Sequence, residues 1–112
     1  MMWWQSGRRW QVADVTLPVI AYSREMGLTH SDFWRLLPRA MGEHQYEADG
    51  DVVKARVADG TLVITLGPTL ERRIALLRLP YSVVSFTFTG VRDIQQQAFK
   101  THFDLHFQRG GG

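Results

Sequence analysis

The sequence predicts a two-layer α+β domain, in which a four-stranded antiparallel meander is flanked by an N-terminal and a C-terminal helix in the order α-β-β-β-β-α. Three observations support this fold class. Apolar and polar residues alternate with a period of two between residues 51 and 89, which is typical of strands with one buried face. Apolar residues recur at helical spacing before and after this block. No helix-length segment separates the strands, which excludes a parallel sheet.

The first helix is predicted to begin after Thr29. Asp32 follows Thr29 by three residues, as in a capping box, and apolar residues then recur at helical spacing: Phe33, Leu36, Leu37 and Ala40. Pro38 has no backbone N–H to donate, so we expect it to kink or end the helix. Gly42 is a natural stop.

Four strands are predicted, each from a set of apolar residues at alternate positions. The sets are Val53, Ala55 and Val57; Leu62, Ile64 and Leu66; Ala75, Leu77 and Leu79; and Val84, Phe86 and Phe88. The segments Asp49-Gly50-Asp51 and Ala58-Asp59-Gly60 are typical of hairpin turns. Gly67-Pro68-Thr69 marks the next turn, and Pro80 separates the third strand from the fourth.

The second helix is predicted from Arg92 to Gln108, with a stop at Gly110. Five of its apolar residues should face the core: Ile94, Ala98, Phe99, Phe103 and Phe107. Because Phe103, Leu105 and Phe107 also alternate, a final strand is the alternative. The predicted core of the domain comprises Phe33, Leu37, Val53, Ile64, Leu66, Leu77, Phe86, Phe88, Phe99 and Phe103.

The sequence predicts a segment 1–26, a single α+β domain 27–109 and a flexible glycine tail 110–112. Three interpretations of segment 1–26 remain open. It is an extra strand or arm packed on the domain through Val15, Leu17, Val19 and Tyr22, a cleaved or disordered leader, or an extension upstream of a true start at Met26.

Composition limits the possible classes of protein. The chain has 112 residues, 45% of them hydrophobic and 21% charged, which is ordinary for one globular domain. It has no cysteine, so disulfides and thiolate chemistry are excluded. No run approaches the roughly 20 apolar residues of a membrane-spanning helix. A signal-like pattern ends near Ala21-Tyr22-Ser23, but Asp14 and Pro18 interrupt it, so we predict a cytoplasmic protein and keep export as the alternative.

From Gly27 to its end, the chain resembles a group of small uncharacterised bacterial proteins of unknown function. The segments GLTHSDFWRLLPRAMG, ERRIALLRLP and FDLHFQRGGG carry this resemblance. It implies no activity, cofactor or catalytic residue.

The outward face of the predicted sheet is the main candidate site, because it combines an apolar patch with basic residues. This candidate binding surface comprises Lys54, Arg56, Val63, Arg72, Ile74, Leu76, Arg78 and Val83. An exposed patch of this kind marks a contact surface. The predicted function is therefore a small non-enzymatic binding or assembly module with a protein partner or a second copy, unless the N-terminal segment or a helix covers the patch.

Other functions rest on weaker patterns. Ubiquitin-like and sulfur-carrier proteins also end in Gly-Gly, so a carrier activated at the tail Gly111-Gly112 is the main alternative. His102 and His106 have the i, i+4 spacing of metal ligands on a helix, but no third ligand is evident. The net charge of +2 and a single outward aromatic, Tyr81, argue against nucleic acid. No catalytic motif is present, and no cofactor is expected.

Overall fold

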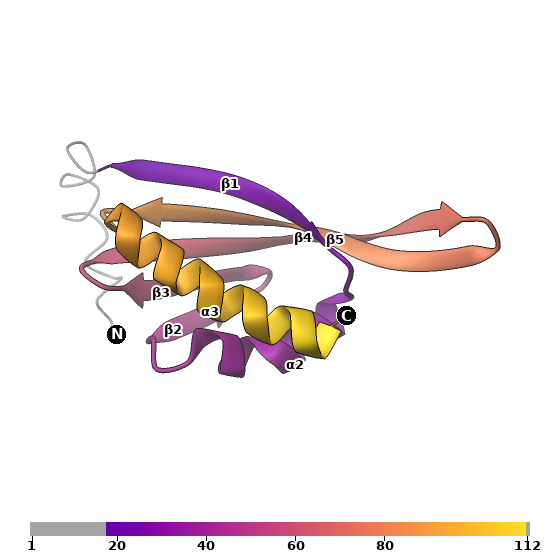
Figure 1. Cartoon of the computed structure of the whole chain (residues 1–112), viewed down its shortest axis with the longest axis horizontal. Helices are drawn as coiled ribbons and strands as arrows, with labels where there is room; N and C mark the ends of the chain where they lie inside the picture. Colours follow the sequence, from indigo (N-terminus) through magenta and orange to yellow (C-terminus); the bar gives the residue numbers. More distant parts are fainter. Residues whose placement is uncertain (1–17, 112) are drawn as a thin grey trace.

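The computed structural model describes residues 18–111 of the chain, and the side chains of residues 18–107. The described elements are, in chain order, β1 (Val19–Met26), α2 (His30–Met41), β2 (Tyr46–Asp49), β3 (Val52–Val57), β4 (Gly60–Ile74), β5 (Leu77–Thr89) and α3 (Asp93–Gly111) (Figure 1). Within this part of the chain the strands form one antiparallel sheet in the order β1-β5-β4-β3-β2. The predicted α+β class and antiparallel sheet are confirmed. The sheet has five strands instead of the predicted four, because a strand precedes the first helix.

The first correction concerns the boundary predicted at Met26, since residues 19–26 are the extra strand that one of the three interpretations of segment 1–26 offered. They form β1, an edge strand paired with β5 from Val19↔Thr89 to Met26↔Ser82. Met26 itself is buried in the core. The boundary predicted at Met26 therefore falls at the end of a strand within the sheet. Val15 and Leu17 lie outside the described residues.

The second correction concerns the strands on either side of Pro68 and Pro80. Instead of three short strands, residues 60–89 form a single long hairpin of β4 and β5. Gly67-Pro68-Thr69 is a bulge inside β4, where the register shifts between Leu66 and Thr69, and is not a turn. Pro80 lies within β5, opposite Glu71.

Three two-residue loops close the hairpins of the sheet, and each begins with a residue at positive φ. Gly50 has φ +61°, Ala58 has φ +54° and Ala75 has φ +55°. A positive φ in a two-residue loop matches the right-handed twist of the flanking strands. The turn at Ala75-Leu76 contains neither glycine nor asparagine, so the sequence carries no turn signal there.

The first helix begins and ends where the sequence predicts. The Thr29 side chain accepts a hydrogen bond from the backbone of Asp32, and the Asp32 carboxylate accepts one from the backbone of Thr29, which completes a capping box. These bonds hold the pKa of Asp32 below its ordinary value. The helix continues three residues past Pro38 to Met41, and Gly42 caps it at φ +62°.

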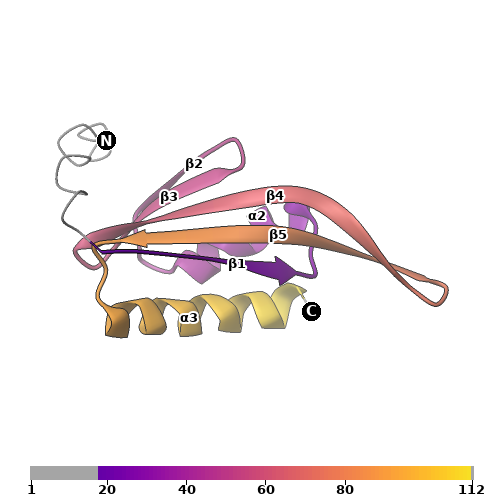
Figure 2. The same ribbon diagram turned by 90° about the horizontal axis from the view of Figure 1, so that it is seen from above.

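The second helix, α3, lies along one face of the sheet (Figure 2). Phe99, Phe103 and Phe107 are buried as predicted. Ile94 is 70% exposed and Ala98 is also exposed, contrary to prediction, and Gln96 is buried instead. The Gln96 amide donates a hydrogen bond of 2.8 Å to the carbonyl of Val91, which satisfies the buried polar group.

A continuous row of aromatic rings runs through the core between the sheet and the two helices. The rings of Phe33, Phe107, Phe103, Phe86 and Tyr22 contact one another in that order, with centroids 4.5–5.5 Å apart. Such pairs add to the stabilisation that burial itself provides. One residue of the predicted core, Leu77, is not buried, since it is 61% exposed. Leu79, on the same face of the strand, is 42% exposed.

Candidate functional site

The β4–β5 hairpin projects beyond the rest of the fold (Figure 1). β1 ends opposite Ser82 and β3 begins opposite Thr65, so residues 70–81 have no neighbouring strand at either edge among the described residues. We call this two-stranded segment the arm. It contributes to the long axis of the molecule, whose extents are 51 × 23 × 23 Å.

The bulge at the base of the arm has a clear physical cause. A Cβ at Gly67 would lie 2.7 Å from the carbonyl oxygen of Val83, so only glycine fits there. The Nε2–H of His30 donates a hydrogen bond of 2.6 Å to the carbonyl of Gly67. The start of α2 thereby holds the point where the arm leaves the sheet.

The strand register separates the arm into two faces. The pairs Leu70↔Tyr81, Arg72↔Leu79 and Ile74↔Leu77 continue the side of the sheet that faces away from the helices, which we call the outer face. The outer face of the arm is mainly apolar and exposed: Leu70 by 42%, Ile74 by 52%, Leu77 by 61% and Leu79 by 42%. Partly exposed Val83, two residues beyond Tyr81, extends this apolar surface onto the body of the sheet, and Val63 lies farther along the same face, beyond Thr65 and Ser85.

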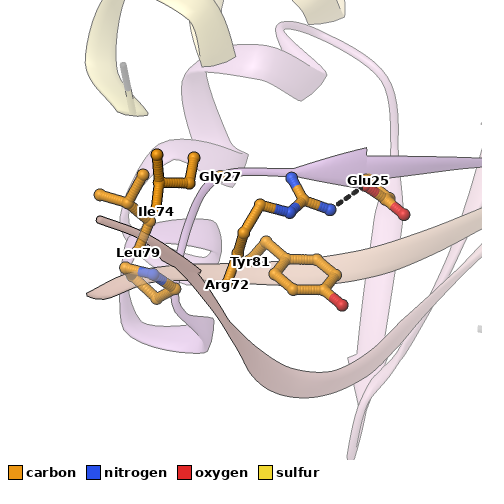
Figure 3. A pocket seen from close by; sticks show the side chains of 7 residues that line it. Glu25, Gly27, Arg72, Ile74, Leu79 and Tyr81 are labelled. Atoms are coloured by element: carbon orange, nitrogen blue, oxygen red, sulfur yellow. Dashed lines mark hydrogen bonds and ion pairs between the residues drawn. The ribbon is translucent and has the colours of Figure 1, made fainter. Parts of the chain in front are cut away.

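A shallow hollow of about 200 Å³ lies where the outer face of the arm meets the end of β1 (Figure 3). The Arg72 guanidinium donates to the Glu25 carboxylate at 2.6 Å and lies over the Tyr81 ring, 4.5 Å from its centroid. The hydrogen bond and the charge of Glu25 raise the pKa of Arg72. Ile74, Leu79 and Pro80 supply the apolar wall of the hollow.

The structure brings six of the eight predicted surface residues to the outer face. Lys54 and Arg56 lie on β3, Val63 lies opposite Lys54 on β4, and Arg72, Ile74 and Val83 follow along the hairpin. Two residues are placed differently. Leu76 lies at the turn of the arm, and Arg78 lies on the other face, opposite Arg73.

The reason for this difference is the unexpected turn at Ala75-Leu76. Sequence analysis ran one alternation through residues 72, 74, 76 and 78 as a single strand, whereas the chain reverses after Ile74. The turn therefore assigns Leu77 and Leu79 to the outer face. Pro80 within a strand is the signal that could have found this free edge, because proline in a sheet is confined to edge strands and bulges.

Nothing in the described residues covers the exposed side chains of the arm, and both helices pack on the opposite face of the sheet. The alternative in which the N-terminal segment covers the patch concerns residues 1–17, outside the described part of the chain.

The two candidate metal ligands lie side by side on α3. The ring centroids of His102 and His106 are 4.4 Å apart. His102 Nε2 lies 3.3 Å from the carbonyl of Arg39, and His106 Nδ1 lies 3.0 Å from the carbonyl of His102. Among the described residues, no group of three or more His, Asp or Glu gathers that could hold a metal ion.

The glycine tail starts within the last helix. α3 continues to Gly111, one residue past the predicted stop at Gly110, and Gly112 lies outside the described residues. Across residues 18–111, neither helix is long and apolar enough to cross a membrane, in agreement with the sequence analysis. Comparison with protein-family models, with curated proteins and with solved structures finds no match for this chain.

Proposed function

We propose that this protein is a small non-enzymatic assembly module that self-associates through the outer face of its sheet and arm. One observation carries the proposal: the arm exposes four large aliphatic side chains on one face, and partly exposed Val83 continues this surface onto the sheet. Contiguous apolar surface of this kind marks a contact site in soluble proteins. The partner that we propose is a second copy of this chain.

The distribution of charge supports a second copy. The arm carries Arg72, Arg73 and Arg78 against one carboxylate, Glu71. Residues 43–51, at the β2 edge of the body, carry four carboxylates and no Lys or Arg. Two copies related by a twofold axis, with their arms antiparallel, would bring each basic arm towards the acidic edge of the other. A surface that complements itself in this way is what a symmetric dimer requires.

The size of the arm indicates how the copies would meet. Six residues at about 3.3 Å each, on two strands about 5 Å apart, give a face of roughly 200 Å². Two arms in contact with each other alone would bury about 400 Å², well below the roughly 1,200 Å² of a stable interface. We therefore propose that each arm lies across the outer face of the partner's sheet, where Val63 and Val83 are available.

Sedimentation equilibrium at several protein concentrations tests this proposal. Leu79→Asp places an unpaired charge in the interface and should raise the dimer dissociation constant at least a hundredfold. The matched control is Leu105→Asp on α3, since Leu105 is 45% exposed and Leu79 is 42% exposed. The control should leave the dissociation constant within threefold of wild type, and added salt should weaken the wild-type dimer.

Two results would overturn the proposal. One is a wild-type protein that stays monomeric at 100 μM or above, a concentration chosen as an order-of-magnitude limit for a weak dimer. The other is an equal loss of association in Leu79→Asp and Leu105→Asp, which would place the interface away from the arm.

A further inference from the structure

The turn of the arm has an apolar surface that the outer face does not account for. Ile74, Ala75, Leu76 and Leu77 form an unbroken apolar run at this turn. Leu76 is 99% exposed, the highest value among the exposed large hydrophobic residues of the described chain. Leu76 sits in the turn itself, on neither face of the ribbon, so packing one outer face on another leaves it in water. We call the turn residues 75–76 the tip.

Two arginines lie close to the tip, one on each strand of the arm. Arg73 and Arg78 are cross-strand neighbours on the face of the arm opposite the apolar one. Within the described residues, neither guanidinium takes part in an ion pair. Like charges directly opposite each other on a ribbon are destabilising. This arrangement favours a negatively charged group that binds both guanidiniums.

The distance between the arginines and the tip fits a lipid surface. Arg73 and Arg78 precede and follow the turn by about two residues, which corresponds to roughly 7 Å along the ribbon. The headgroup layer of a bilayer is about 5–7 Å deep on each side. When the two guanidiniums lie among phosphates, Ala75 and Leu76 therefore reach the edge of the hydrocarbon. The backbone of the turn stays in the interfacial layer, where its polar groups can still be hydrated.

From these observations we infer that the tip inserts into the surface of anionic bilayers, with Arg73 and Arg78 binding lipid phosphates. A turn whose leucine is almost fully exposed suits a fluid surface better than a small ligand. Basic residues near an anionic membrane and buried apolar side chains act together in such binding. The inference is independent of the proposed dimer, which uses outer-face residues such as Ile74 and Leu77 and leaves the turn residues Ala75 and Leu76 free.

Vesicle co-sedimentation tests the inference with the full-length protein. The vesicles are phosphatidylcholine alone, or phosphatidylcholine with phosphatidylglycerol as about a third of the lipid. Wild type should sediment with the anionic vesicles and stay in solution with the neutral ones. Leu76→Ser should weaken binding to the anionic vesicles about tenfold or more. Arg73→Ser with Arg78→Ser should weaken it at least tenfold.

Leu105→Ser is the matched control, because it removes an exposed leucine from α3 and should bind as wild type does. Insertion is read separately from the fluorescence of Leu76→Trp, compared with wild type as background. The added tryptophan should shift to shorter wavelength with anionic vesicles and be quenched by lipids brominated along their chains.

Three outcomes would overturn the inference. The first is wild type that remains in solution with anionic vesicles. The second is an Arg-dependent binding that Leu76→Ser leaves unchanged and that gives no emission shift in the Leu76→Trp variant, since this would be surface attraction without insertion. The third is a dimer, formed without lipid, that Leu76→Ser dissociates. This would show that the tip contacts the second copy of the chain. Vesicle binding by a wild-type protein that stays monomeric would support insertion of the tip and refute the proposed dimer.

Discussion

His30 and Gly67 are joined by a hydrogen bond of 2.6 Å between the imidazole Nε2–H and the backbone carbonyl. His30 is the first residue of α2, and Gly67 lies in the bulge where β4 leaves the body of the sheet. The other ring nitrogen, Nδ1, lies 3.9 Å from the Asp51 carboxylate. The base of the arm is thus bound to the helical layer, which orients the exposed apolar face relative to the body.

Replacement of Gly67 tests the geometry of this bulge. In Gly67→Ala, the new Cβ would lie 2.7 Å from the Val83 carbonyl oxygen, which belongs to the rigid backbone of the paired strand. We expect the free energy of unfolding to fall by about 1–3 kcal/mol, measured by urea denaturation.

Gly27→Ala is the control for this substitution. A Cβ at Gly27 meets no heavy atom within 4 Å, and Gly27 has no positive φ. This variant should be neutral or more stable by up to about 1 kcal/mol, because alanine restricts the unfolded chain. A Gly67→Ala protein as stable as Gly27→Ala would contradict the close approach of β4 and β5 at the bulge.

The capping box at the start of α2 makes a separate prediction. Thr29→Ala removes the side-chain oxygen that accepts from the Asp32 backbone, so the free energy of unfolding should fall by about 1 kcal/mol. Ser31→Ala, an exposed neighbour in the first turn, should change it by less than about 0.5 kcal/mol. Urea denaturation at pH 7 measures both, and equal effects would show that the cap contributes nothing specific.

Tyr22 predicts a pH dependence in the alkaline range. Burial against the aromatic core and the nearby Asp104 carboxylate raise the pKa of Tyr22 to about 12, against 10.0 ordinarily. The folded protein therefore holds this proton more tightly than the unfolded chain. The resulting stabilisation is fully present below pH 10 and is lost as the pH rises through 12. Since Tyr22 is only partly buried, we expect a loss of about 1 kcal/mol.

Comparison with Tyr22→Phe isolates this contribution from other groups that titrate above pH 10. The difference in unfolding free energy between wild type and Tyr22→Phe should shift by about 1 kcal/mol in favour of the variant between pH 9.5 and 12. A difference that stays constant across that range would show that the pKa of Tyr22 is the same in the folded protein as in the unfolded chain.

Local patterns in the sequence determined the parts of the fold that depend on neighbouring residues. The period of two between Val53 and Leu66 predicts both the strands and their buried face, because side chains alternate whatever the strand pairs with. Thr29 and Asp32 predict the start of α2 for the same reason, since a capping box involves four consecutive residues. The outward position of Lys54, Arg56 and Val63 follows from the same alternation.

Only the tertiary structure decided which of the alternating apolar residues are buried and which are exposed. Leu77 and Leu79 repeat the pattern of a buried strand, yet they are exposed because the arm extends past the helices and past the ends of β1 and β3. Long-range pairing turned residues 19–26 into a strand, and it drew Gly67-Pro68 into a bulge rather than a turn. A sequence pattern shows which side chains share a face, whereas burial depends on what packs against that face, and distant segments supply that packing.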